Sequence, residues 1–122
     1  MRTRRTKLFP PSGLAQRVVD YATNGKYAGA YGNAWIECRG DRLYVRGYKC
    51  KQLQLATWRF KTRGRGHATA LLGYLEALLT MGELSQTALF VESVSNERFA
   101  NFLRRRAGWV EVAGPSFVYA AL

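Results

Sequence analysis

The stretch that decides the fold is residues 53–72, LQLATWRFKTRGRGHATALL. Its apolar, aromatic and β-branched beginning predicts a strand over 52–60. From Ala68 onward the apolar residues fall three and four positions apart, which predicts an amphipathic helix over 66–81. The segment RGRGHA at 63–68 joins the two. The stretch therefore predicts a strand that leads into a helix through a basic, glycine-rich turn.

The flanking segments extend this unit into one small domain. A short apolar run over 87–93 predicts a second strand and completes a β-α-β unit. The predicted fold class is α+β, an α/β sandwich with helices packed on a mixed, mainly antiparallel sheet. Residues 1–12 are expected to form a basic tail and 13–122 a single domain. The other predicted elements are a helix over 13–24 with Ser12 as its N-cap, strands over 30–38 and 43–48, a helix from a Ser95 cap to Ala107, and strands over 109–112 and 117–121.

Composition excludes several classes of protein. The chain has 122 residues, of which 48% are hydrophobic, and this is enough for a core. No stretch approaches the roughly 20 apolar residues that span a bilayer, and no apolar segment of a secretory signal follows the basic start. One histidine and two cysteines do not supply a tetrahedral zinc site. We expect a cytoplasmic protein with two reduced thiols and no metal.

The positive charge is concentrated in the first half of the chain. The formal net charge is +11, and residues 1–65 contain fifteen basic and three acidic residues, whereas residues 66–122 contain four and five. A surface with this gradient should attract a polyanion, such as a nucleic acid, a phosphorylated cofactor or an acidic protein.

The glycine-rich turn has the chemistry of an anion site. Gly64 and Gly66 allow the backbone to bend tightly, and the helix that follows offers unpaired N–H groups and a partial positive charge. The turn lacks the Lys-Ser/Thr pair of a P-loop and the full G-x-G-x-x-G pattern of a dinucleotide fold. Basic side chains flank it at Arg59, Lys61, Arg63 and Arg65.

Two motifs resemble those of the GCN5-related N-acetyltransferases. RGRGHA at 63–68 matches the Q/R-x-x-G-x-G/A signature of that superfamily, and NERFANFLRRRAGW at 96–109 is similar to its second signature. The resemblance covers residues 43–112. Residues 1–42 are shorter than the usual N-terminal part, so the resemblance implies an N-terminally shortened domain.

The resemblance implies acetyl-CoA as co-substrate and a primary amine as acceptor. The amine would belong to a protein lysine, to an N-terminus or to a nucleic-acid-associated acceptor, and it would attack the thioester directly. The strand residues Ala56, Thr57 and Trp58 would pair with the pantetheine arm, with Asn96 beside it. The pyrophosphate would be held by Arg63, Gly64, Arg65, Gly66, His67, Ala68 and Thr69.

The catalytic side chains are less well defined. Many family members have a tyrosine four residues before the helix-ending glycine, and the residue at that position here is Arg104. The candidates to replace it as general acid are Tyr74, Ser93 or Ser95, and Tyr119. Glu92, near the end of a predicted strand, is the candidate general base. A carboxylate there could equally be paired with one of the many arginines.

The sequence is also compatible with a second function. The chain could be a non-catalytic module of the same fold that binds nucleic acid or a protein through its basic N-terminal half. Its tryptophans and tyrosines could stack on bases, although packing between strands would also account for them. A homodimer is also compatible with the sequence.

Overall fold

The computed structural model describes residues 8–61, 66–92 and 96–120. Helices and strands follow in the predicted order. Their bounds are α1 (Gly13–Asn24), β1 (Ala34–Cys38), β2 (Asp41–Arg46), β3 (Gln52–Arg59), α2 (His67–Thr80), β4 (Ala88–Val91), α3 (Glu97–Arg105), β5 (Trp109–Ala113) and β6 (Ser116–Ala120).

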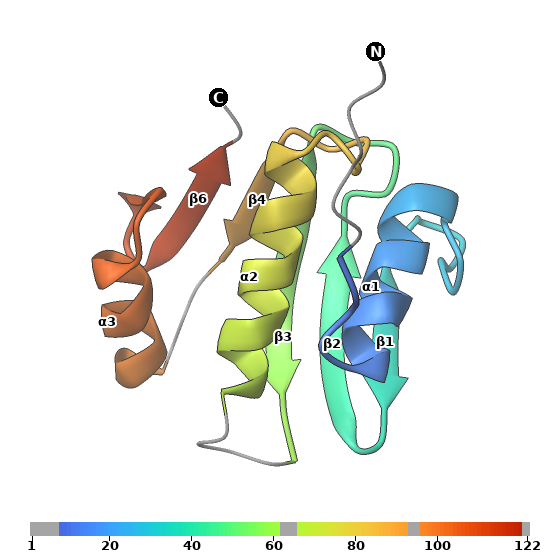
Figure 1. Cartoon of the computed structure of the whole chain (residues 1–122), viewed down its shortest axis with the longest axis horizontal. Helices are drawn as coiled ribbons and strands as arrows, with labels where there is room; N and C mark the ends of the chain where they lie inside the picture. Colours follow the sequence, from blue (N-terminus) through green and yellow to red (C-terminus); the bar gives the residue numbers. More distant parts are fainter. Residues whose placement is uncertain (1–7, 62–65, 93–95, 121–122) are drawn as a thin grey trace.

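The strands form one six-stranded sheet with the order β1-β2-β3-β4-β6-β5. All neighbouring strands are antiparallel except β3 and β4, which are parallel. The helix α2 connects these two strands and lies across them (Figure 1). The mixed α+β architecture and its β-α-β unit are therefore confirmed.

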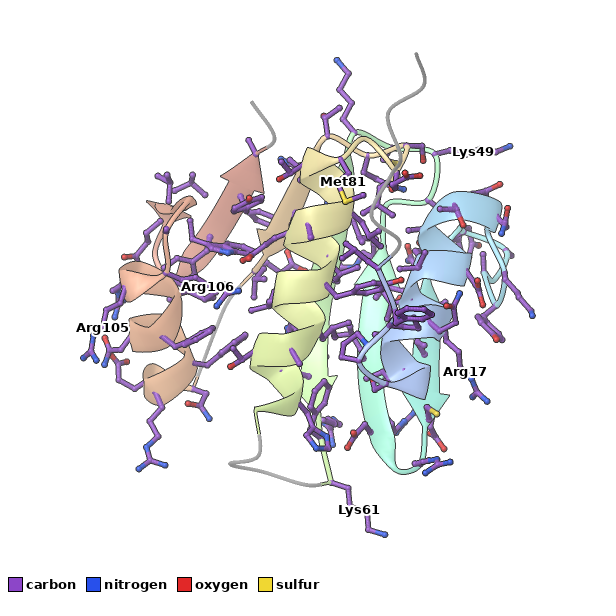
Figure 2. The ribbon with its side chains drawn as sticks, in the orientation of Figure 1. Arg17, Lys49, Lys61, Met81, Arg105 and Arg106 are labelled. Atoms are coloured by element: carbon purple, nitrogen blue, oxygen red, sulfur yellow. The ribbon has the colours of Figure 1, made fainter. Side chains whose placement is uncertain are left out.

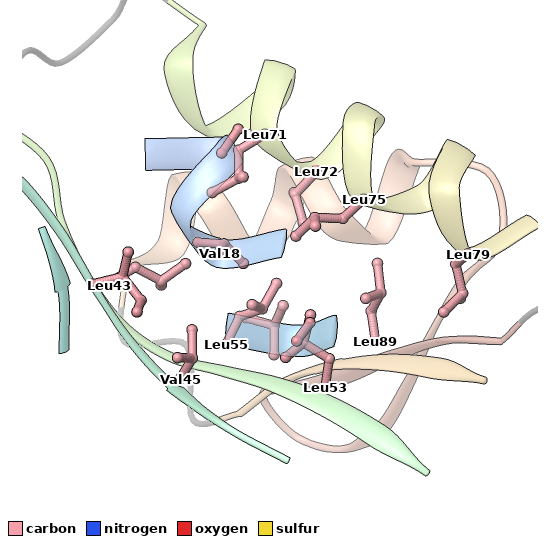
Figure 3. Packing of buried hydrophobic residues seen from close by; sticks show 14 of the residues in the cluster. Val18, Leu43, Val45, Leu53, Leu55, Leu71, Leu72, Leu75, Leu79 and Leu89 are labelled. Carbon is pink, nitrogen blue, oxygen red and sulfur yellow. The ribbon is translucent and has the colours of Figure 1, made fainter. Parts of the chain in front are cut away.

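All three helices lie on one side of the sheet, which we call the inner face (Figures 1 and 3). One continuous core joins buried residues of α1, α2 and α3 to alternate residues of the strands. Leu71, Leu72 and Leu75 of α2 point toward Leu53 and Leu89 of the sheet (Figure 3). Burying such leucine side chains contributes about 1.5–3 kcal/mol each. The opposite side, which we call the outer face, is not covered by a helix of the described chain.

Helix ends follow local sequence rules. The Ser12 side chain accepts a hydrogen bond from Ala15 N at 3.1 Å, so the predicted N-cap of α1 is confirmed. Gly25, with φ of +70°, ends α1 in the left-handed conformation that glycine favours. The cap of α3 is Asn96 and not Ser95, because the Asn96 side chain accepts from Phe99 N at 3.1 Å. That helix ends at Arg105, two residues before the predicted end.

Strand boundaries differ from the predictions near turns. The first strand begins at Ala34 and not at residue 30, because Gly29 N donates to Asn33 O and closes a turn before it. The next strand spans 41–46 and not 43–48. It starts early because Cys38 pairs with Asp41 across a two-residue hairpin loop, Arg39-Gly40, in which both φ angles are positive.

A partly buried polar network ties α2 to α3 and β5. The Glu76 carboxylate on α2 accepts from Arg106 Nε at 2.7 Å and from Arg106 Nη2 at 2.8 Å. It also accepts from Trp109 Nε1 on β5. Arg106 is directed toward α2, whereas Arg105 points away from the body of the protein (Figure 2). Local sequence patterns do not predict this network, because Glu76 is thirty or more positions from both of its partners.

A buried tyrosine fixes the loops at one end of the sheet. Tyr21 on α1 is fully buried, and its hydroxyl donates to Gly32 O and accepts from Tyr48 N. Burial raises the pKa of Tyr21 above its ordinary value of 10.0, the charges of Cys50 and Tyr44 raise it further, and the hydrogen bond from Tyr48 N opposes them. The phenol is therefore held in its neutral form.

This shift predicts a loss of stability in alkali. Because the pKa of Tyr21 is raised in the folded state, its protonated phenol contributes to the free energy of unfolding in full below pH 10.0. This contribution is lost as the pH rises further, because the unfolded chain releases the proton first. Urea unfolding between neutral and alkaline pH should show this decline. Tyr21→Phe should lower the free energy of unfolding by about 1–3 kcal/mol at neutral pH, because Gly32 O and Tyr48 N lose their partner. The stability of this variant should also fall less steeply with rising pH than that of the wild type. An equal decline in both proteins would contradict the prediction. Tyr31→Phe, at an exposed tyrosine, is the control.

Candidate functional site

The parallel strands β3 and β4 separate halfway along β3. Their pairing runs from Gln52 and Ala88 to Leu55 and Val91, where β4 ends. β3 continues to Arg59 and remains paired with β2 on its other edge. In the described part of the chain, the edge of 56–59 that faces β4 has no strand partner. Such an edge offers backbone N–H and C=O groups to an extended ligand.

A β-bulge lies at the point of separation. Val45 pairs with Leu55 and Tyr44 pairs with Thr57, so Ala56 is an extra residue with no partner on β2. A bulge bends its strand and redirects the side chains that follow. The bulge places Trp58 on the inner face, in register with Leu43, and Thr57 on the outer face with Tyr44. The three predicted strand residues, Ala56, Thr57 and Trp58, are therefore at the opening itself.

The N-terminus of α2 lies at the same end of the sheet. Its N-cap is Gly66, with φ of +71°, and no side chain of the described residues caps this end. The first turn contains no acidic residue. Ala70 N donates to Gly66 O and begins the helical pattern, so the N–H groups of His67, Ala68 and Thr69 precede it. This terminus retains its positive partial charge for an anion.

Asp41 holds both sides of the glycine-rich turn. Its Oδ1 accepts from Lys61 N, just after β3, at 2.8 Å, and its Oδ2 lies 3.4 Å from His67 Nδ1 at the start of α2. The His67 ring is thus directed at Asp41. The sequence does not single out Asp41, because no local pattern connects it to a segment twenty positions later.

Several predicted site residues lie outside the described residues. These are Arg63, Gly64, Arg65 and Ser93, together with the proposed cap Ser95.

A shallow hollow of about 540 Å³ adjoins the end of β3. It is positively charged, because three of its lining side chains are cationic. Lys61 extends away from the end of β3 (Figure 2). The lining residues are Gly40, Arg42, Thr57, Trp58, Arg59, Phe60 and Lys61.

Aromatic side chains connect β3 to α3 on the inner face. The Trp58 ring lies 5.1 Å from that of Phe99 and 5.6 Å from that of Phe60, and Phe99 stacks on Phe102 at 6.0 Å. Trp58 Nε1 donates to Leu55 O at 3.3 Å. These contacts fix the start of α3 next to the opening between β3 and β4.

The predicted general base is already in an ion pair. Glu92 follows β4, and its Oε1 lies 2.7 Å from Arg46 Nη2 on β2. Its side chain is 28% exposed. Register explains the contact, because Arg46 pairs with Gln54 and Gln54 pairs with Phe90, two positions before Glu92 on the outer face. The carboxylate therefore lies at the mouth of the opening with an arginine beside it.

Tyr74, a further catalytic candidate among the described residues, lies on α2. Burial raises the pKa of Tyr74 on α2, and the charge of Asp20 on α1 adds to this, so Tyr74 faces α1. Among the described residues no hydrogen bond joins Tyr74 to Glu92. Arg104 donates to Glu111 Oε1 at 3.0 Å and to Asn101 Oδ1 at 2.8 Å. The Glu111 hydrogen bond raises the pKa of Arg104, and the same bond lowers the pKa of Glu111.

No protein-family model, curated protein or solved structure matches this chain. Within the described ranges, no helix is long and apolar enough to cross a membrane. No group of three or more His, Cys, Asp or Glu side chains that could hold a metal ion occurs there either. Cys38 and Cys50 are both free thiols. The chain is thus a mixed α+β protein. Its parallel strands β3 and β4 separate beside the N-terminus of α2, which no described side chain caps.

The structure gives Asn96 a capping role that can be tested separately from any ligand. Asn96→Ala should lower the free energy of unfolding by about 0.5–2 kcal/mol, because Phe99 N loses its acceptor. Asn96→Asp should restore that stability, since a carboxylate caps equally well and favours a helix N-terminus. Urea unfolding measures both. Asn101→Ala, in the same helix, is the control for helix content. Equal losses for Asn96→Ala and Asn96→Asp would contradict the capping role.

Proposed function

We propose that this chain is an acetyl-CoA-dependent N-acyltransferase of the GCN5-related type that acetylates a primary amine. The observation that carries the proposal is the end of β3–β4 pairing at Leu55 and Val91, next to the uncapped N-terminus of α2. One ligand with an extended amide-containing arm and a pyrophosphate would use both features. The motif resemblance at 63–68 and 96–109 supports the same assignment.

The described residues fit the two ends of acetyl-CoA. The unpaired edge of Ala56–Arg59 suits the pantetheine arm, whose amides would replace the missing strand. The N–H groups of His67, Ala68 and Thr69 suit the pyrophosphate. Acetyl-CoA, when bound, supplies an activated thioester. The cations at Arg59 and Lys61 add favourable charge nearby.

The chain would act mainly by orientation and by proton transfer. The edge of β3 would align the thioester carbonyl with the acceptor nitrogen, which gains the acetyl group as the C–S bond breaks. Glu92 would take the proton that the attacking amine loses, directly or through a water. The departing thiolate needs one proton. General acid help is worth about 10²–10⁴-fold, so a proton from solvent suffices for a slower reaction.

Acetyl-CoA binding is the first test. At a concentration about 100 times its dissociation constant the ligand should stabilise the folded chain by about 2.7 kcal/mol, which a thermal shift assay detects. Desulfo-CoA should produce a comparable shift, because it retains the arm and the phosphates. The absence of any shift at millimolar acetyl-CoA would overturn the proposal. Transfer of the acetyl group to lysine-containing peptides, followed by mass spectrometry, then tests catalysis.

A matched pair of glycine variants tests the site. Gly66 and Gly82 lie at opposite ends of α2 with φ of +71° and +74°, and a Cβ at either would meet nothing within 4 Å. Gly66→Asp should abolish the acetyl-CoA shift, because it adds a carboxylate where the pyrophosphate would bind. Gly82→Asp carries the same backbone strain and should keep the shift. Loss of the shift in both variants, or in neither, would contradict the assignment.

A further inference from the structure

The outer face of β1 and β2 carries a row of four side chains, in which two neighbouring aromatic rings have an arginine at either end. The row runs Arg42, Trp35, Tyr44, Arg46, and we call it the aromatic–arginine row. Trp35 and Tyr44 face each other across the β1–β2 pair, with ring centroids 5.2 Å apart. The Arg42 guanidinium lies 4.4 Å from the Trp35 centroid, and that of Arg46 lies 5.6 Å from the Tyr44 centroid.

These side chains are held in place while they remain accessible. The core is on the inner face, so Trp35 takes no part in it, and 42% of its surface is exposed. Arg42 Nε lies 3.0 Å from the Glu37 carboxylate without forming a hydrogen bond to it, and Arg46 is anchored by Glu92. Trp35, with the Arg42 guanidinium against its ring, therefore presents an aromatic surface that is open to a ligand on the outer face.

The row continues into the cationic hollow at the end of β3. Arg42 belongs to both, and it pairs in register with Arg59 on the same face. Thr57 is in register with Tyr44 of the row and also lines the hollow. Arg59 forms no ion pair with another described residue. The outer face thus joins the aromatic side chains of β1 and β2 to cations on β2 and β3.

We propose that this outer face binds single-stranded nucleic acid. Bases would stack on Trp35 and Tyr44, and phosphates would lie against Arg42, Arg46 and Arg59. Charge complementarity favours this occupant, since these strands belong to the basic half of the chain. Single strands fit better than a duplex, because only unpaired bases expose the ring faces that aromatic side chains stack on. The proposal does not depend on acyl transfer.

Fluorescence anisotropy with short labelled oligouridine and oligothymidine, and with a duplex of equal length, provides the test. The full chain should bind one or both single strands more tightly than the duplex at about 50 mM salt, and more weakly at about 200 mM. Binding of RNA, DNA or both supports the proposal and identifies the polymer. No binding of either single strand at the lower salt, or tighter binding of the duplex, would overturn it.

Variants separate stacking from simple charge attraction. Trp35→Leu and Tyr44→Leu should each weaken binding by about 5- to 150-fold, because stacking of a base is worth about 1–3 kcal/mol. Trp35→Phe keeps an aromatic face and should recover most of the affinity. Arg59→Gln should reduce the salt slope by about one. Tyr31→Ala removes an aromatic side chain that is 94% exposed and lies outside the row, so it should bind normally.

Two results keep the proposals distinguishable. Trp35→Leu should retain the thermal shift with acetyl-CoA, and this also shows that the variant is folded. Gly66→Asp should retain oligonucleotide binding. Wild-type affinity in both Trp35→Leu and Tyr44→Leu would mean that the charge alone attracts the polymer, and would overturn the stacking site.

Discussion

The fold depends on the parallel pairing of β3 with β4. The chain can place a strand parallel to its predecessor only by returning along the sheet, and α2 makes that return with its leucine face buried. The pairing is short because β4 has only four residues, Ala88–Val91. β3 is twice as long, so past Leu55 it continues without β4 and is paired only with β2. The opening between the strands and the position of the helix N-terminus both follow from this difference in length.

The described helices cover only one face of the sheet. Because α1, α2 and α3 all pack on the inner face, β1, β2 and the first half of β3 alternate between core residues and residues of the outer face. The two halves of that outer face differ. Phe90, Val118 and Val110 stand in register across β4, β6 and β5, and Val110 is 61% exposed. Cations and the neighbouring rings of Trp35 and Tyr44 occupy the half formed by β1, β2 and β3.

Local sequence patterns predict most of the fold. Helical periodicity located α1 and α2 closely, because Ser12, Gly25 and the leucine spacing are local signals. Long-range contacts could not be predicted. The Glu76–Arg106 pair and the double contact of Asp41 join segments that only the folded chain brings together. For the same reason the sequence identified Glu92 as a candidate base without identifying Arg46 as its partner.

The positive charge of the chain cannot by itself distinguish the two proposed ligands. Arg59 and Lys61 would attract both a coenzyme pyrophosphate and a polynucleotide, and salt would weaken both attractions. The geometry does distinguish them. A pyrophosphate needs the N–H groups at the start of α2, whereas a base needs the flat rings of Trp35 and Tyr44. Because Arg46 reaches Glu92 across β3, the aromatic–arginine row and the opening between β3 and β4 share one ion pair.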